Sequence, residues 1–276
     1  MTIDSAGLGS SALDSPVGRT IETRRDAGSG ALISYLPIGF PDLDTSVDAA
    51  VALVENGVDI LELGLPYSDP VMDGPAIQVA TQQALRNGFR LRDVFTAVER
   101  IRSRVDAPVV VMTYWNPVLQ YGPTRFADQL KDAGGAGLIT PDITPDSAAD
   151  WIAESERTGL DRIFLAAPSS TDARLKQIVD ASRGFVYTVS TMGVTGARAD
   201  VDAAARGLVA RLRDAGAERA CVGIGISTAE QVAEVLEYAD GAIVGSALVS
   251  SLADGGVAGL ARTAAALAEG ARSGRP

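Results

Sequence analysis

Short runs rich in β-branched residues alternate with longer segments along nearly the whole chain of 276 residues. The longer segments carry apolar residues three and four positions apart, as at Val47, Ala50, Val51 and Val54, which is typical of helices that cover a core with one face. Apolar strands separated by such helices indicate a parallel sheet covered by helices. The expected strands are residues 30–39, 58–66, 107–115, 135–142, 161–169, 184–191, 219–227 and 240–247.

Eight such units in about 250 residues fit a closed (β/α)8 TIM barrel better than an open doubly wound sheet. No linker divides the sequence, so we expect a single catalytic domain over residues 18–276, after a flexible Ser/Gly-rich tail at residues 1–17. The second and third strands are far enough apart for two helices, at residues 71–88 and 90–103. Pro75 suits the first position of a helix, and Ser227 and Glu230 have the spacing of a capping box.

The charge and the cysteine count exclude several kinds of partner. The chain has 24 basic and 35 acidic residues and a net charge of −11, the wrong sign for a surface that binds phosphodiesters, so no nucleic-acid partner is expected. No signal-peptide pattern or membrane-length apolar run occurs, so no membrane partner is expected either. The one cysteine, Cys221, cannot form an intrachain disulfide, and we expect a cytoplasmic location.

Two absences limit the chemistry. The sequence has no histidine, which removes the most common acid–base residue and metal ligand, and we expect no metal site. Its two lysines, Lys131 and Lys176, lie in stretches with helical periodicity, so neither is placed to form a Schiff base at a strand end. Any catalysis must therefore use carboxylates, tyrosines, hydroxyls and backbone groups.

An acidic residue within the second expected strand is the strongest catalytic candidate. Side chains alternate along a strand, so Ile60, Glu62 and Gly64 share one face while Leu61 and Leu63 take the face that meets the helices. Glu62 is thus expected to point into the barrel near its reactive end. Loss of hydration there would raise its pKa to a range where it both gives and takes a proton. The alternative is a glutamate that an arginine holds for structural reasons.

Two more carboxylates, Asp69 and Asp73, follow in the loop after this strand. Each also fits an ordinary role, because aspartate is common in turns and because a negative charge is favourable at the start of a helix. Together with Glu62, they would bring two or three carboxylates to one pocket.

Glycine-rich turns follow three of the last strands, at residues 193–197, 223–227 and 245–248. Glycine permits close approach of the backbone, the N–H groups that open a helix bind anions, and barrels often bind phosphate in their last two loops. These turns therefore predict a phosphate site built from backbone donors. Residues of inward parity that would either wall an aromatic pocket or simply pack the barrel are Tyr35, Met112, Tyr114, Ile139 and Tyr187.

Several segments together closely resemble the tryptophan synthase alpha subunit family. The longest is "LELGLPYSDPVMDGPAIQ", and the others are "YLPIGFPD", "MTYWNPV", "GLITPDIT", "STMGVTGAR", "GIGIST" and "VGSALV", so the resemblance covers about residues 18 to 270. It implies a (β/α)8 barrel that cleaves indole-3-glycerol phosphate to indole and glyceraldehyde 3-phosphate by a retro-aldol reaction, in L-tryptophan biosynthesis. It also implies an alpha2–beta2 assembly in which a beta subunit holds pyridoxal phosphate (PLP), with no cofactor in this chain.

Carried over position by position, the family's catalytic carboxylates fall on Glu62 and Asp73. The phosphate-binding positions fall on Gly196, Gly225, Gly245 and Ser246. The substrate-contacting positions fall on Tyr35, Tyr114, Tyr187 and Thr195, and Thr195 is expected to meet Asp73 when its loop closes. Two residues depart from the family pattern: Phe40, where many relatives have aspartate, and Thr191, where some have arginine.

The implied reaction needs neither an imine nor a metal, in agreement with the residues present. Two alternatives stay open. One is another phosphate-binding barrel enzyme, such as a sugar-phosphate isomerase or indole-glycerol-phosphate synthase, although the latter relies on a lysine that this sequence does not place at a strand end. The other is a non-catalytic subunit that only regulates a partner, against which the presence of both Glu62 and Asp73 argues.

Overall fold

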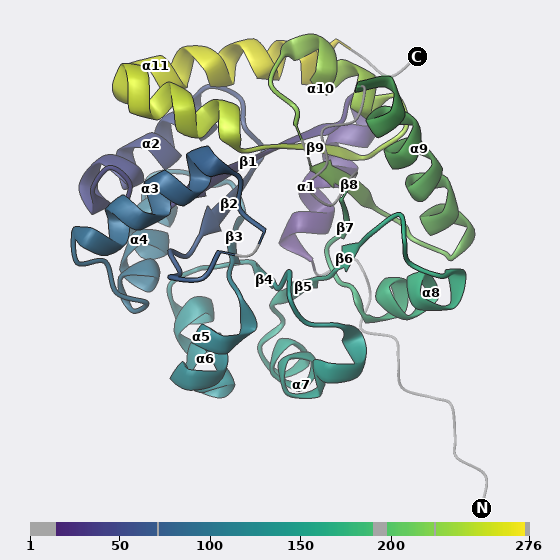
Figure 1. Ribbon diagram of the computed structural model, residues 1–276, viewed down its shortest axis with the longest axis horizontal. Coiled ribbons are helices and arrows are strands. Elements are labelled where there is room, and N and C mark those ends of the chain that lie inside the picture. Colours follow the sequence, from purple (N-terminus) through teal and green to yellow (C-terminus); the bar gives the residue numbers. More distant parts are fainter. Residues whose placement is uncertain (1–14, 71, 190–197, 224, 274–276) are drawn as a thin grey trace, which may run out of the picture.

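The computed structural model describes residues 15–70, 72–189, 198–223 and 225–273. Within these residues the strands lie at the centre of the molecule and helices surround them (Figure 1). All neighbouring strands are parallel. The strands are β1 (Ala31–Pro37), β2 (Ile60–Gly64), β3 (Val109–Met112), β4 (Gly137–Ile139), β5 (Asp161–Ile163), β6 (Leu165–Ala166), β7 (Val186–Val189), β8 (Ala220–Gly223) and β9 (Gly241–Val244).

The described strands form one sheet in the order β5-β4-β3-β2-β1-β9-β8-β7-β6. Its two edge strands, β5 and β6, are separated in the chain by Phe164 alone. This single stretch pairs with β4 through its first half and with β7 through its second, which closes the sheet into a barrel. The predicted (β/α)8 barrel is therefore confirmed, and the fifth expected strand is divided into two short ones.

The helices follow the strands as the alternation predicts, with extra helices after β2 and β3. Two helices, α3 and α4, lie between β2 and β3 as expected. The described helices are α1 (Pro16–Asp26), α2 (Leu43–Glu55), α3 (Pro75–Arg86), α4 (Asp93–Arg102), α5 (Trp115–Tyr121), α6 (Pro123–Asp132), α7 (Ala149–Thr158), α8 (Asp172–Ala181), α9 (Arg198–Asp214), α10 (Ala229–Leu236) and α11 (Ser246–Arg272), with a 3-10 turn at Pro145–Ser147.

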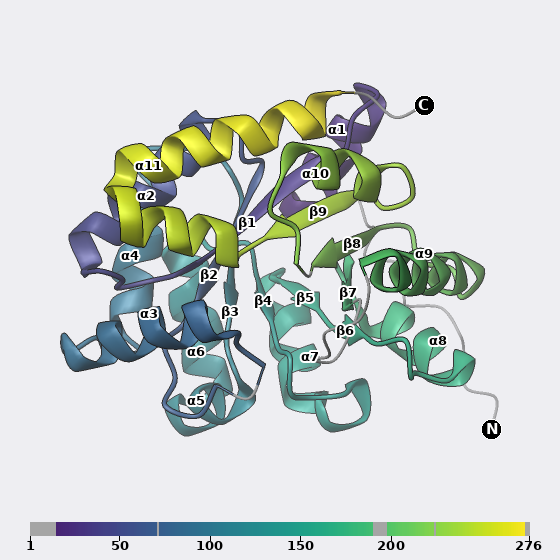
Figure 2. The ribbon, with the colours of Figure 1, turned by 45° about the horizontal axis from the view of Figure 1, so that its top comes forward.

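Local signals account for several helix boundaries. Pro75 takes the first turn of α3, as predicted. The predicted capping box at the start of α10 is wrong by one residue, because Thr228 is the N-cap and accepts a hydrogen bond from the backbone N–H of Gln231. The side-chain oxygen of Gln231 accepts in return from the N–H of Ser227. Gly256 has a φ of 59° and divides α11 into two segments, which Figure 2 shows at an angle to each other.

The apolar residues form two clusters on opposite faces of the sheet. Ile60 belongs to the smaller cluster, which fills the barrel interior with one or two residues from most strands. Leu61 and Leu63 belong to the larger cluster between the sheet and the helices. This confirms the predicted alternation along β2, and it fixes the inward direction for the side chains of the site.

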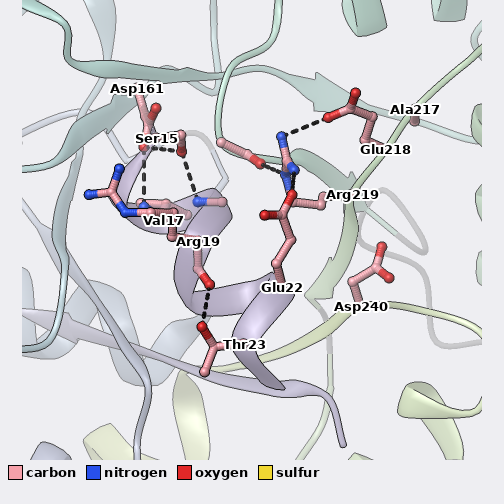
Figure 3. A network of polar contacts seen from close by, with 12 residues as sticks. Ser15, Val17, Arg19, Glu22, Thr23, Asp161, Ala217, Glu218, Arg219 and Asp240 are labelled. Atoms are coloured by element: carbon pink, nitrogen blue, oxygen red, sulfur yellow. Dashed lines mark hydrogen bonds and ion pairs between the residues drawn. The ribbon is translucent and has the colours of Figure 1, made fainter. Parts of the chain in front are cut away.

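Helix α1 closes the N-terminal end of the barrel. Its residues Val17 and Ile21 pack with the interior cluster. The Ser15 hydroxyl caps the helix by accepting from the N–H of Gly18, and it donates to the buried carboxylate of Asp161 over 2.7 Å (Figure 3). The tail boundary expected at residue 17 thus lies inside α1, where Ser15 and the backbone N–H of Val17 both donate to Asp161, far away in the sequence. Across the described residues, no helix has the length and hydropathy needed to cross a membrane.

Candidate active site

Glu62 lies inside the barrel on β2. In the sheet it is level with Tyr35 of β1 and with Val110 of β3. Its side chain is fully buried, and neither carboxyl oxygen has a hydrogen-bond partner among the described residues. The structural alternative, a glutamate held by an arginine, therefore finds no support in the described part of the chain.

The electrostatic environment of Glu62 favours its neutral form. Burial raises the pKa of Glu62 to about 8, and the carboxyl group of Asp73 adds to the rise. At this pKa the side chain is mostly protonated near neutral pH and is still able to ionise. Glu62 can therefore act as an acid and as a base within one reaction cycle.

Of the two carboxylates in the loop after β2, only Asp73 joins Glu62. Asp73 is half-buried just before the start of α3, and burial raises its pKa. Asp69 is exposed and accepts a hydrogen bond from the hydroxyl of its neighbour Ser68 over 2.6 Å. The site thus holds two carboxylates rather than three.

Two tyrosines wall the interior beside Glu62. Burial raises the pKa of Tyr35 well above its usual value, and the charges of Asp73 and Glu62 add to the effect. Burial likewise raises the pKa of Tyr187, with Glu62 as the next cause. Both hydroxyls therefore stay protonated and able to donate hydrogen bonds across the pH range in which Glu62 titrates.

Glycines on the neighbouring strands make room for these two rings. A Cβ atom at Gly64 would lie 2.2 Å from Tyr35 Oη, and one at Gly223 would lie 2.4 Å from Tyr187 Oη. Any larger residue at either position would displace a tyrosine that borders Glu62. The inward face of β2 thus carries the Glu62 carboxyl group and also Gly64, which leaves room for the ring of Tyr35 on the neighbouring strand β1.

The described glycines of the predicted phosphate site lie at the same end of the barrel as Asp73. Gly225 follows β8, is exposed and has a φ of 62°, a conformation that favours glycine. Gly245 follows β9 as the N-cap of α11, and Ser246 is the first residue of that helix. The first turn of a helix presents N–H groups without intrahelical partners. Gly196, Thr195 and Thr191 lie outside the described residues.

The sequence patterns did not identify the contacts that hold the loop of Asp73. The N–H of Met72 donates to Tyr114 Oη over 2.9 Å, and Gln78 Nε2 of α3 donates to the backbone oxygen of Asp73 over 2.8 Å. Asn116 Nδ2 also donates to Tyr67 Oη over 3.1 Å. These partners come from different elements, and no spacing in the sequence pairs them.

A surface groove of ≈ 650 Å³ lies on the outside of the barrel, along α4 and α6. Phe95 and Tyr121 are among its lining residues, and it contains none of the predicted site residues. The described residues contain no group of three or more acidic or cysteine side chains that could hold a metal ion. The candidate residues Glu62 and Asp73 lie at the barrel mouth, away from this groove.

These features define a (β/α)8 barrel with two carboxyl groups of raised pKa at its mouth, an arrangement suited to acid–base chemistry. The family model for the tryptophan synthase alpha chain matches residues 21–272. The chain belongs to this family, which confirms the resemblance seen in the sequence. The alpha subunit of tryptophan synthase is a lyase that cleaves indole-3-glycerol phosphate.

Individual relatives agree with the family model. The chain is 73% identical over 257 residues to the tryptophan synthase alpha chain of Leifsonia xyli, covering 93% of this chain and 98% of the relative. Its fold matches a structure of Mycobacterium tuberculosis tryptophan synthase with a TM-score of 0.89 and 52% identity, covering 94% and 99% of the two chains. It also matches the tryptophan synthase complex of Pyrococcus furiosus, with a TM-score of 0.79 and 34% identity over 87% and 98%.

Proposed function

We propose that Glu62 carries both proton transfers when this chain cleaves indole-3-glycerol phosphate to indole and glyceraldehyde 3-phosphate. The observation behind this proposal is a fully buried carboxyl group without a hydrogen-bond partner among the described residues and with a pKa of about 8. Such a group is available to bond a ligand that enters the barrel. It is also mostly protonated near neutral pH yet still able to ionise, which suits a group that must first donate and then accept a proton.

The reaction needs one proton delivered and one removed. Neutral Glu62 protonates the indole carbon that carries the glycerol phosphate chain, which places positive charge on the ring. The resulting carboxylate takes the proton of the hydroxyl on the adjacent side-chain carbon. The carbon–carbon bond then breaks, its electron pair returns to the ring to restore neutral indole, and the side chain leaves as an aldehyde. Glu62 ends the cycle protonated, as it began.

Asp73 is proposed to bind the indole N–H and to stabilise the charge that develops on the ring. Its half-buried position makes this electrostatic interaction stronger than it would be in water. Its proximity to Glu62, through which it raises the pKa of that residue, agrees with a ligand that spans both carboxyl groups. Tyr35, Tyr114 and Tyr187 would contact the substrate around them.

The phosphate is proposed to bind at Gly225, Gly245 and Ser246, together with Gly196. Backbone N–H groups at the start of α11 and in the turn after β8 would supply the donors, which suits a protein with a net charge of −11. Held there, away from the bond that breaks, the phosphate would fix the position of the indole ring relative to Glu62.

We also propose that the chain works in an alpha2–beta2 assembly with a tryptophan synthase beta subunit. The name of the Pyrococcus furiosus structure, a tryptophan synthase complex, supports such an assembly. PLP would belong to the beta subunit, and this chain would use no cofactor of its own. Thr195 would contact Asp73 when its loop closes over the substrate. A single catalytic domain and a cytoplasmic location also stay predictions.

The decisive experiment measures indole released from indole-3-glycerol phosphate, with and without a beta subunit. Wild-type protein should release indole, and Glu62→Gln should lower kcat by at least about a hundredfold while KM changes little, because glutamine keeps the size of the side chain but cannot transfer a proton. Asp69 is exposed in the loop after β2 and provides a control. In the absence of the beta subunit, Asp69→Asn should release indole at close to the wild-type rate. Near-normal turnover by Glu62→Gln would refute the assigned role. Absence of indole under every condition would point to the non-catalytic alternative.

A further inference from the structure

The loop that carries Asp73 is joined to the start of α5 at two points. Met72, next to Asp73, donates its backbone N–H to Tyr114 Oη over 2.9 Å. Earlier in the same loop, Tyr67 Oη accepts from Asn116 Nδ2 over 3.1 Å, and the Tyr67 and Tyr114 rings lie 5.4 Å apart between centroids. The path of the loop therefore depends on residues that flank the first turn of α5.

Tyr114 itself is held firmly. It is 7% exposed and occupies the N-cap position of α5, two residues after the end of β3. The next residue, Trp115, donates its backbone N–H to both carboxyl oxygens of Asp142, at 2.9 and 3.0 Å, which ties the start of α5 to the segment after β4. Because Tyr114 is fixed in this way, its hydroxyl can hold the loop of Met72 and Asp73 in place, and the loop has little effect on the position of Tyr114.

The Tyr114 hydroxyl contacts the backbone of the loop rather than a side chain, so it fixes the path of the chain next to Asp73. A hydrogen bond to the N–H of Met72 fixes the peptide one residue before Asp73, while Gln78 Nε2 fixes the backbone oxygen of Asp73 itself. The carboxyl group of Asp73 projects from between these two anchors. Loss of one anchor frees its side chain to move relative to Glu62, which lies on a strand and cannot follow.

We propose that Tyr114 is a positioning residue whose hydroxyl, by holding the backbone at Met72, places the carboxyl group of Asp73 against Glu62. This deepens the proposed function, on which it rests, because it gives Tyr114 a role through the loop in addition to contact with the substrate. The role requires the hydroxyl and not only the ring.

A change in the position of Asp73 has a measurable electrostatic consequence. The titratable groups that act on or with Glu62 are Asp73 from the loop, Tyr35 from β1 and Tyr187 from β7. Both tyrosines stay neutral in the relevant range, because burial raises their pKa values. If Asp73 moves away, Glu62 loses the neighbouring negative charge and gains water, and both changes lower the pKa of Glu62.

The test is Tyr114→Phe, which keeps the ring and its contact with Tyr67 and removes only the hydroxyl that accepts from Met72. In this variant we expect kcat to fall about tenfold, with KM changed less than about twofold, since one hydrogen bond is lost. The pH at which Glu62 titrates should move to a lower value. A matched control is Tyr238→Phe, which removes a tyrosine hydroxyl that bonds Asp202 of α9, away from the mouth. It should match wild type in both measurements.

Two readouts do not require turnover and separate this proposal from the proposed function. The Glu62 carboxyl group can be titrated by difference infrared or ¹³C NMR spectroscopy, with its signal assigned by its loss in Glu62→Gln. Hydrogen exchange at the Met72 amide should be faster in Tyr114→Phe than in wild type. If wild type releases no indole but both signals shift as stated, the proposed function fails and the positioning role stands.

Two results would overturn the positioning role. One is a Glu62 titration and a Met72 exchange rate that are the same in Tyr114→Phe and in wild type. The other is a variant in which only KM rises while kcat and the Glu62 titration are unchanged, because Tyr114 would then act only through contact with the substrate.

Discussion

The burial of Glu62 affects both the proposed catalysis and the stability of the fold. Its burial raises the pKa that the proposed mechanism uses, and the same burial makes the ionised form costly to the fold. Neither carboxyl oxygen has a hydrogen-bond partner among the described residues, so the native state favours the neutral form of this group. The cost becomes visible above about pH 4.5, where the glutamate ionises in the unfolded chain but still holds its proton in the folded one.

The unfolding free energy should therefore depend on pH through Glu62. The pKa of Glu62 is about 8 in the folded chain and 4.5 for an ordinary glutamate, so the folded state binds the extra proton between these values. The stability linked to that proton is fully present below pH 4.5 and is lost as the pH rises through 8. Glu62→Gln cannot ionise, so its stability should exceed that of wild type by an increasing amount, on the order of a few kcal/mol by pH 9.

Urea unfolding of both proteins at several pH values between 5 and 9 would measure this difference. Burial also raises the pKa of Asp161, to about 6, but both proteins share that group, so its effect cancels in the comparison. If the two stability curves run parallel across the range, Glu62 does not carry the raised pKa.

Asp69 and Asp73 mark the limit of what the sequence can predict at the residue scale. Both are aspartates in one loop, and each has an ordinary role as well as a catalytic one. The inward parity of Glu62 follows from alternation along a strand, a regular local property. A loop has no such period, so the exposure of Asp69 and the burial of Asp73 depend on contacts such as that between Met72 and Tyr114, which lie 42 positions apart.

At the scale of elements, local periodicity predicted the eight-unit alternation and the pair of helices between β2 and β3. It did not predict how the first and last strands of the sheet are joined into a barrel, or that α1 covers the N-terminal end of this barrel. Closure depends on the two-sided pairing of the stretch around Phe164. Helix α1 depends on a contact between Ser15 and Asp161, 146 positions apart. Both features arise from pairings between distant segments, which a single sequence does not encode in any period.

The docking of α1 rests on a network of buried charges at the N-terminal end (Figure 3). Asp161 accepts from the Ser15 hydroxyl and from the N–H of Val17, and it forms an ion pair with Arg183 over 3.3 Å. Arg219 pairs with Glu22 of α1 and donates to the backbone oxygen of Gly184. These contacts join α1 to the strands at the end of the barrel opposite the candidate site, where residues serve stability rather than catalysis.

Ser15→Ala should therefore cost stability without affecting catalysis. It removes both the N-cap of α1 and a partner of buried Asp161, so we expect a loss of about 1–3 kcal/mol in unfolding free energy and an unchanged kcat. Thr171→Ala provides the matched control, because Thr171 caps the exposed start of α8 by accepting from the N–H of Arg174 and has no role toward a buried charge. The loss of unfolding free energy in Thr171→Ala should be smaller than that in Ser15→Ala. Equal losses, or a fall in kcat for Ser15→Ala alone, would contradict this division between the two ends.

At the scale of the whole molecule, parallel strands bring every C-terminal strand end to one mouth. Glu62 on β2, the tyrosines on β1 and β7, and the glycines after β8 and β9 thus lie toward one end of the barrel although they span most of the sequence. The loop that contributes Asp73 lies at this mouth, and the proposal gives the loop of Thr195 and the beta subunit a role there too. Binding of substrate and binding of the partner would then change the same loops.

Thermodynamic linkage makes this coupling testable. If the partner favours the closed form of the loops, substrate must tighten partner binding by the same factor by which the partner tightens substrate binding, and such factors are typically about 5 to 150. Glu62→Gln allows the measurement, since it should bind indole-3-glycerol phosphate without cleaving it. Calorimetric titration of beta subunit into this variant should give a lower Kd with saturating substrate than without it. The double variant Glu62→Gln, Gly225→Val should lose this effect at the same substrate concentration, because valine at a φ of 62° would disrupt the proposed phosphate turn. Equal partner affinities with and without bound substrate would mean that the two events act on separate parts of the molecule.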